Sequence, residues 1–393
     1  MNNIGTIARG IKTPLIKEGD DLIEIIIDSV LKASKDGNFE IKDNDVLAIT
    51  ESVVSISQGN YVTIDNIKDD IKSKFKTDHI GVLFPMLSRN RFSGILKAIA
   101  RASKKITIQL SYPFDEVGNG ILYIEDLKKL NINPYQDIIN ELTYQKHFAH
   151  FVHPFTKLNM IDYYRNLCEK ENVEVEFILS NNPTTILEYT KNIIVSNVHK
   201  RNETKKILVN EPHDKVLSLD EIVNDETNKH GFNKTFGLLG SNIATKEKLK
   251  LFPSLNDPIV YKIQKKIKEI TKKDIHVMIY GDGAFKDPVS GIWELADPLV
   301  SPSFTKGLLG SPSEIKLKYL IDNNKNLTNE ELKDLIEKEI ANKSSHDTDD
   351  KKLGTTPRMY VDLLGSLSDL ISGSGEKGTP IVYIENYFSS YSD

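Results

Sequence analysis

The stretch DPIVYKIQKKIKEITKKDIHVMIYGDG, residues 257–283, joins a helix pattern to a strand pattern and then to an acidic loop. Asp257 and Pro258 form a favourable helix start, and isoleucines recur at helical spacing up to the two lysines at 272 and 273. The apolar run IHVMIY, 275–280, predicts a buried strand. A loop directly after such a strand lies where open α/β sheets place their ligands.

The same alternation of helix and strand patterns recurs elsewhere in the chain. Near the N-terminus, a helix capped by Asp20 or Asp21 and ended by Gly37 precedes a short buried strand at 46–49. Between 159 and 198, a helix pattern is followed by a strand, a turn, a helix and another strand. This order predicts βαβ-type packing with a partly parallel sheet, and a mixed α/β fold.

Composition sets the broad class of the protein. The 393 residues are enough for two domains, and a hydrophobic content of 39% supplies a sizeable core. With 51 basic and 56 acidic residues, the net charge of −5 gives no general attraction for nucleic acid or for an anionic membrane. The single cysteine, Cys168, excludes an internal disulfide. With no apolar run of signal-peptide or membrane-spanning length near the N-terminus, we expect a cytoplasmic protein.

The loop YGDGAFKDPVSGIWELADP, residues 280–298, gathers acidic side chains among turn-forming residues. The carboxylates of Asp282, Glu294 and Asp297 are hard oxygen ligands suited to Mg²⁺ or Mn²⁺, and Asp287 is a weaker candidate. The alternative is that these acids cap turns and pair with exposed lysines. The sequence therefore predicts a metal site here without excluding a structural loop.

The segment SRNRFSGILKAIARASKK, residues 88–105, carries six positive charges and no acid. If it is helical, Lys97, Arg101 and Lys104 fall on one face. One interpretation is a solvated basic face. The other is a site for a phosphate or a carboxylate, to which Arg89, Lys97 and Arg101 would contribute.

Three histidines recur in the string KHFAHFVHPF, residues 146–155. His147, His150 and His153 could bind zinc or iron, but they alternate with phenylalanines and Pro154 interrupts the helix. Structural or substrate contacts are the favoured interpretation. The chain has no GxxxxGK[ST], GxGxxG or GxSxG motif, so a P-loop, a fingerprint dinucleotide site and a nucleophile elbow lack support.

The N-terminal and C-terminal thirds resemble the coenzyme F420-0:L-glutamate ligase family, which joins glutamate to a phosphorylated acceptor with GTP and a divalent metal ion. The similar stretches are GIKTPLIKEGDDL at 10–22, DVLAITESVVSISQGN at 45–60, KHGF and GLLGSN within 229–242, KEITKKDIHVMIYGDGAF at 268–285, and GTPIVYIE at 378–385. The resemblance implies a ligase-like fold made by residues 1–80 and 226–393, with an inserted α/β lobe at 81–225.

The resemblance also implies an activity and a site. The activity is a GTP- or ATP-dependent, Mg²⁺- or Mn²⁺-dependent ligation of glutamate, or a similar amino acid, to a small phosphorylated or carboxylated acceptor, by a homodimer. Asp282 matches a metal ligand of the family. The residues that match nucleotide contacts are Lys12, Thr13, Pro14, Leu15, Ser241 and Asn242.

Three positions depart from the family pattern. Leu239 stands where a second motif has a metal-binding aspartate, Ile56 stands where a basic residue is usual, and Gly283 replaces a threonine. Two further interpretations therefore stay open. One is a non-catalytic relative that binds a nucleotide or metabolite, and the other is a metal-dependent hydrolase or phosphotransferase.

Overall fold

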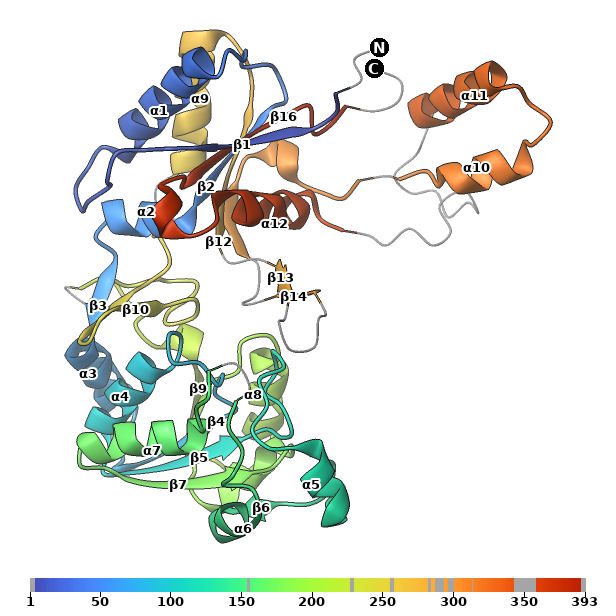
Figure 1. The fold of residues 1–393 in the computed structure, drawn as a ribbon. Helices are drawn as coiled ribbons and strands as arrows, with labels where there is room; N and C mark the ends of the chain where they lie inside the picture. The colour runs from blue at the N-terminus through green and yellow to red at the C-terminus, as the bar shows by residue number, and fades with distance from the viewer. Residues whose placement is uncertain are drawn as a thin grey trace. The chain divides into compact units, whose positions relative to one another are not determined.

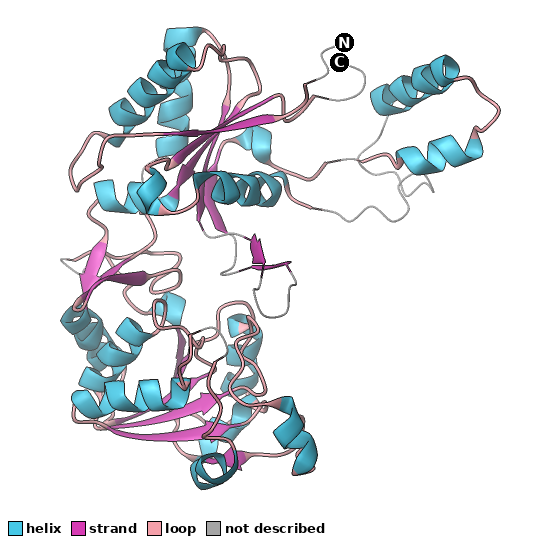
Figure 2. Ribbon diagram, in the orientation of Figure 1, coloured by secondary structure: helices cyan, strands magenta, loops and turns pink. Residues whose placement is uncertain are grey.

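The computed structural model describes residues 4–153, 156–226, 230–254, 258–281, 300–312, 314–342 and 358–389, with the backbone alone at 284–286 and 293–295. The fold is mixed α/β, as predicted (Figures 1 and 2). The chain forms two compact units. Unit 1 contains Met1–Val54, Leu255–Ala284 and Asp297–Asp393, and unit 2 contains Ser55–Ser254 and Phe285–Ala296.

Unit 1 is built on a five-stranded sheet with the order β1-β16-β2-β12-β15. The strands are β1 (Ile7–Ile11), β16 (Ile381–Glu385), β2 (Val46–Thr50), β12 (His276–Gly281) and β15 (Val300–Phe304). The central strands β2 and β12 run parallel, and the other neighbouring pairs run antiparallel. The strand patterns at 46–49 and 275–280 are thus neighbours in the sheet.

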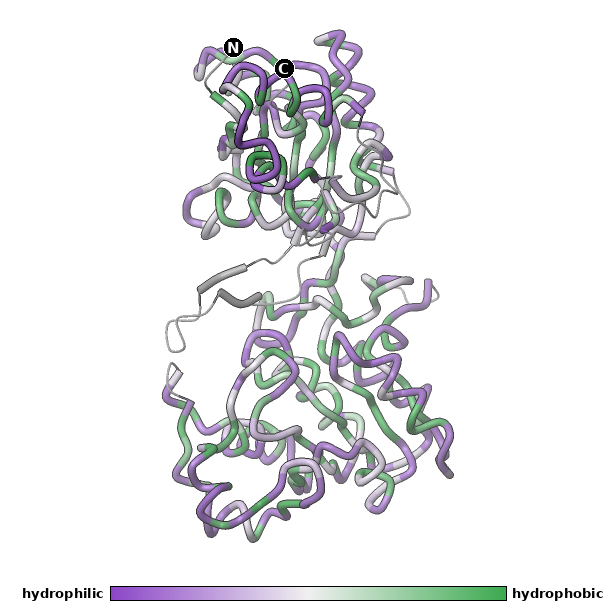
Figure 3. Tube along the Cα trace, turned by 90° about the vertical axis from the view of Figure 1, so that its right-hand side faces the viewer, coloured by the Kyte–Doolittle hydropathy of each residue, from purple (hydrophilic) through white to green (hydrophobic). Residues whose placement is uncertain are grey.

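Helices cover both faces of this sheet. Leu47 and Ile49 pack with helices α1 (Leu22–Asp36) and α9 (Ile259–Thr271), whereas Val46 and Ala48 face α12 (Tyr360–Ser372). The alternation arises because successive side chains of a strand point to opposite faces. Figure 3 shows apolar segments along these interior strands. The predicted ends of α1 are confirmed, since Asp21 Oδ1 accepts a hydrogen bond from Glu24 N and Gly37 caps the last turn.

Unit 2 contains a six-stranded sheet with the order β6-β7-β5-β4-β8-β9. The strands are β4 (His79–Leu83), β5 (Lys105–Leu110), β6 (Ile139–Asn140), β7 (Glu174–Leu179), β8 (Asn192–Val195) and β9 (Lys215–Ser218). All pairs are parallel except the edge pair of β6 with β7. The βαβ-type packing predicted from the sequence is confirmed.

The helices of unit 2 also lie on both faces of its sheet. Helices α4 (Ser93–Ala102) and α7 (Met160–Lys170) share one core with α3 (Ile64–Lys74), while the 3₁₀ helix η1 (Pro183–Glu188) and α8 (Arg201–Val209) share the other. Because α3 packs against α4, residues before position 81 belong to the same core as the predicted lobe.

Smaller elements complete the described chain. A three-stranded antiparallel sheet joins β10 (Asn242–Thr245), β11 (Lys248–Lys250) and β3 (Tyr61–Thr63), and β13 (Ala284–Lys286) pairs with β14 (Trp293–Leu295). The remaining helices are α2 (Glu51–Ser57), α5 (Ile124–Lys129), α6 (Glu141–His147), η2 (Leu219–Glu221), η3 (Lys306–Leu308), α10 (Leu317–Asn323), α11 (Asn329–Asn342) and η5 (Gly375–Lys377). Within the described ranges, every helix is too short or too polar to cross a lipid bilayer.

Candidate functional site

A pocket of about 810 Å³ in unit 1 is lined by β1, the turn after it and helix α1. Its wall includes Lys12, Thr13 and Pro14, three of the four residues of this turn predicted to lie near a nucleotide. The fourth, Leu15, is absent from the wall and is 89% exposed. The volume falls in the range of small-molecule sites, about 300–1,000 Å³.

The pocket wall is rich in charge. Its charged residues are Arg9, Lys12, Asp28, Lys32 and Asp36. Arg9 is held in place, because its Nε donates to Glu385 Oε1 at 2.6 Å and its guanidinium lies 4.8 Å from the centre of the Phe39 ring. Lys12 and Lys32 are at least partly exposed. Their ammonium groups can therefore meet an anionic ligand at the mouth of the pocket.

The other predicted nucleotide contacts, Ser241 and Asn242, lie in unit 2 where β10 begins. Ser241 is 2% exposed, and its Oγ has no hydrogen-bond partner among the described residues. This segment contacts the loop after β4, since Arg91 Nη1 donates to Gly240 O at 3.2 Å. The structure thus brings the pair to the loop that carries Arg89, one of the predicted anion-binding residues.

Leu239 belongs to the core of unit 2 and is 5% exposed. It stands where the ligase motif carries a metal-binding aspartate. A carboxylate at this position would be surrounded by apolar side chains, which strongly disfavours its charged form. The departure therefore affects core packing as well as the candidate metal ligands.

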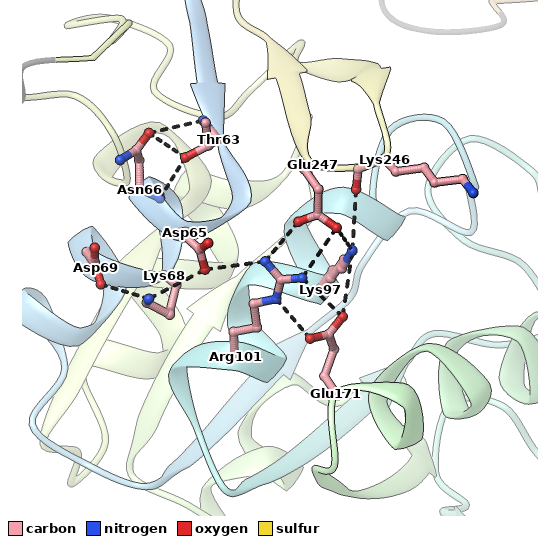
Figure 4. Close-up of polar contacts among 10 residues, drawn as sticks. All are labelled: Thr63, Asp65, Asn66, Lys68, Asp69, Lys97, Arg101, Glu171, Lys246 and Glu247. Atoms are coloured by element: carbon pink, nitrogen blue, oxygen red, sulfur yellow. Dashed lines mark hydrogen bonds and ion pairs between the residues drawn. The ribbon is translucent and has the colours of Figure 1, made fainter.

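Lys97 and Arg101, the other predicted anion-binding residues, lie one turn apart on α4 and form ion pairs (Figure 4). Arg101 Nε lies 2.8 Å from Glu171 Oε2 and its Nη1 lies 2.9 Å from Glu247 Oε2. Lys97 Nζ lies 2.5 Å from Glu247 Oε1, and hydrogen bonds from Lys97 and Arg101 lower the pKa of Glu247. An anion here would compete with two carboxylates, so its binding by these residues stays a prediction.

The ion pairs of Arg101 lead to a prediction about the stability of the protein. Glu171→Gln is expected to lower the free energy of unfolding by about 1–2 kcal/mol at low ionic strength, because the Arg101 contact is charge-assisted and Glu171 is only 18% exposed. Urea unfolding at low and high salt measures the loss, which should shrink as salt screens the charges. Glu169→Gln is the matched control, since Glu169 is exposed on the same helix. Equal losses of stability in the two variants would contradict a stabilising ion pair between Glu171 and Arg101.

The predicted metal ligands cannot be placed in the same way. Asp282 and Asp297 lie outside the described residues, and only the backbone of Glu294 is described, in β14. Within the described ranges, no three His, Cys, Asp or Glu side chains come together as a metal site. Strand β12 ends at Gly281, so Asp282 directly follows the carboxyl end of a buried strand.

The three histidines contact different partners. His147 ends α6, His150 Nε2 lies 2.9 Å from Asp126 Oδ2, and His153 Nδ1 accepts a hydrogen bond from Thr156 N. These contacts favour the structural interpretation over a shared metal.

The sequence can also be compared with models of known protein families. A model of the F420-0:gamma-glutamyl ligase family matches residues 10–386, nearly the whole chain. The chain belongs to this family. The match confirms the resemblance found in the terminal thirds and extends across the middle of the chain. No curated protein matches the chain.

Motif reasoning within the ligase family missed part of the pocket wall. Arg9, Lys32 and Phe39 line the pocket but lie in no motif that was compared. One sequence signal could have found this wall. Asp28, Lys32 and Asp36 recur every fourth residue, which predicts a charged stripe along one side of α1.

Proposed function

We propose that this member of the ligase family forms an amide bond of the γ-glutamyl type, in a reaction that consumes GTP or ATP and requires Mg²⁺ or Mn²⁺. The family match over residues 10–386 carries the proposal. The pocket beside Lys12, Thr13 and Pro14 supports it, because a pocket of this size with exposed cations suits a nucleotide.

In the proposed reaction, the γ-phosphoryl group of the nucleotide is transferred to a carboxylate oxygen of the acceptor, which for a γ-glutamyl bond is the γ-carboxylate of a glutamate unit. This step gives an acyl phosphate and a nucleoside diphosphate. The amino nitrogen of glutamate then attacks the carbonyl carbon. The bond from that carbon to the phosphate oxygen breaks, inorganic phosphate leaves, and the nitrogen loses a proton. The acceptor is a small phosphorylated or carboxylated molecule, and we propose a homodimer as the assembly.

Several of the predicted site residues have a proposed role in this reaction. In unit 1, Lys12 binds nucleotide phosphate. In unit 2, the resemblance to the ligase family supports Ser241 and Asn242 as polar contacts to a nucleotide. Arg89 binds an anionic group of the acceptor. A divalent cation held by Asp282 with Glu294 or Asp297 would neutralise the triphosphate charge, and carboxylates are the donor type such a cation prefers.

A second function is favoured by one observation. Leu239, which by the resemblance matches a metal ligand of the family, is buried in the core. A protein that lost this ligand could retain nucleotide or metabolite binding without catalysis. Metal dependence separates the two functions, since binding alone does not require the metal-held triphosphate.

Nucleotide binding can be tested by thermal unfolding. GTP or ATP with Mg²⁺ is expected to raise the melting temperature, because a ligand that binds only the folded state stabilises it. Lys12→Ala should weaken the affinity about tenfold, the effect of losing one charge-assisted contact. Lys17→Ala is the control, because Lys17 is exposed nearby but does not line the pocket.

Catalysis can be tested by phosphate release. With a small-molecule extract depleted of glutamate and inorganic phosphate as the source of acceptor, phosphate should be released only when glutamate is supplied. A shift in melting temperature without metal and without glutamate-dependent release would favour the non-catalytic relative. Release without glutamate would favour a hydrolase.

A further inference from the structure

The sheet of unit 2 reverses its strand order at β4. β4 pairs in parallel with both β5 and β8, and in chain order the five parallel strands stand as 3-2-1-4-5 (Figure 1). Open sheets with this topology bind ligands beyond the carboxyl ends of their strands, where the order reverses. The loop 84–92 after β4 and the loop after β8 with the first residue of α8, together 196–201, form this edge. We call the two loops the reversal edge.

A third loop holds the two loops of the reversal edge together. Asp115, in the loop after β5, accepts a hydrogen bond at 2.9 Å from Leu87 N. The next residue, Glu116, accepts one at 3.0 Å from His199 N. Consecutive carboxylates thus fix loops that lie more than 100 residues apart in sequence. Both carboxylates are therefore already bound to backbone N–H groups.

The reversal edge itself carries only positive charge. Loop 84–92 contains Arg89 and Arg91, loop 196–201 contains Lys200 and Arg201, and neither contains an acid. Arg201 Nη1 donates to Val198 O and its Nε lies 3.3 Å from Asp220 Oδ1, whereas Arg89 and Lys200 are exposed. Two exposed cations beside a reversal of strand order favour an anionic group such as a phosphate.

Two buried amide oxygens flank β4 at the same end of the sheet. Asn197 is 4% exposed, and its Nδ2 donates to Thr204 Oγ1 at 3.0 Å. Gln109 is fully buried, and its Nε2 donates to Ser180 O at 3.0 Å. Neither Asn197 Oδ1 nor Gln109 Oε1 has a hydrogen-bond partner among the described residues. Buried acceptors in proteins are normally hydrogen-bonded, so we expect each of these oxygens to accept a hydrogen bond from a bound group.

We propose that the reversal edge binds a phosphorylated nucleoside. Its phosphate lies at Arg89 and Lys200, and its ribose hydroxyl or base amino groups donate to the amide oxygens of Asn197 and Gln109. The site is built from residues of unit 2 alone. It uses Arg89 for the phosphate in place of the acceptor contact proposed above, so the two roles of Arg89 are alternatives.

Hydrogen exchange of the full chain tests this location, with AMP, GMP and NAD⁺ as probes and no divalent metal. At least one probe should slow exchange in both 84–92 and 196–201, because bound ligand suppresses local opening. Protection confined to 9–14 and 28–39, or to 239–245, would assign the binding to the ligase site and overturn the inference. No protection in either loop of the reversal edge would also overturn it.

Inorganic phosphate separates a nucleoside site from a simple anion site. It should protect the reversal edge less than the most protective probe at equal concentration, because it lacks donors that reach the amide oxygens. Equal protection by inorganic phosphate would mean an adventitious ion only, and would overturn the proposal.

Surface variants supply the matched comparison. The double variant Arg89→Gln with Lys200→Gln should lower the affinity for the most protective probe at least about tenfold, as measured by isothermal titration calorimetry, since two charge-assisted contacts are lost. Lys206→Gln is the control for the charge change, because Lys206 is exposed more than one turn further along α8. Unchanged affinity in the double variant would refute the site. Glutamate-dependent phosphate release reports on the ligase independently, so either proposal can fail alone.

Discussion

Asp282→Asn is expected to weaken Mn²⁺ binding in the presence of GTP by more than about hundredfold. The resemblance to the ligase family implies that Asp282 is a metal ligand, and in the sequence it directly follows the carboxyl end of β12. Removing an outer partner of a metal ligand already costs about 10–100-fold in affinity or activity, so loss of a ligand should cost more. A titration of free Mn²⁺ by electron paramagnetic resonance measures the affinity directly.

Asp287→Asn is the matched control, because it removes the same charge from the same acidic loop. We expect a much smaller effect there, since Asp287 is the weaker candidate ligand. Equal losses in both variants would mean that the loop attracts cations only through its net charge. In that case Asp282 would have no special role, and the metal-dependent reaction would lose its predicted metal-binding site.

The secondary structure of unit 1 could be predicted from the sequence because its signals are local. Asp21 caps a helix, Gly37 ends it, and the buried strands at 46–50 and 276–281 are short apolar runs. Both central strands are covered by helices on each face, so nearly every residue in them is apolar. Patterns of this kind depend on the residues of one segment alone.

Other features depend on residues far apart in the chain. The sequence of the basic helix left open whether it is a solvated face or an anion site. Neither interpretation foresaw the ion pairs with Glu171 and Glu247, which lie 70 and 146 residues from Arg101. The pocket wall likewise forms only because β1 lies beside α1, and no sequence motif predicts that contact. A family motif was enough to single out Lys12 and Thr13, which line the pocket, and their contact with a nucleotide stays a prediction. The candidate site was not predictable where tertiary contacts decide which charges stay exposed.

Leu239→Asp is expected to destabilise unit 2 by about 4 kcal/mol at neutral pH, although it restores the residue type of the family motif. Leu239 is 5% exposed within the core, so the change removes buried apolar surface and introduces a carboxylate without a partner. Such a loss is a large part of the roughly 5–15 kcal/mol that stabilises a typical domain. Urea unfolding followed by circular dichroism measures it.

Lowering the pH should reduce the loss of stability caused by Leu239→Asp. Burial raises the pKa of a carboxyl group, so the introduced aspartate side chain should be neutral in the folded protein at a pH where it ionises after unfolding. Its destabilising effect is therefore expected to grow as the pH rises and to shrink as the pH falls. Leu15→Asp, at a position 89% exposed, should change the stability by no more than about 0.5 kcal/mol. If Leu239→Asp instead kept its stability and tightened Mn²⁺ binding, position 239 would belong to the metal site, and the departure from the family would be a reversible loss of one ligand.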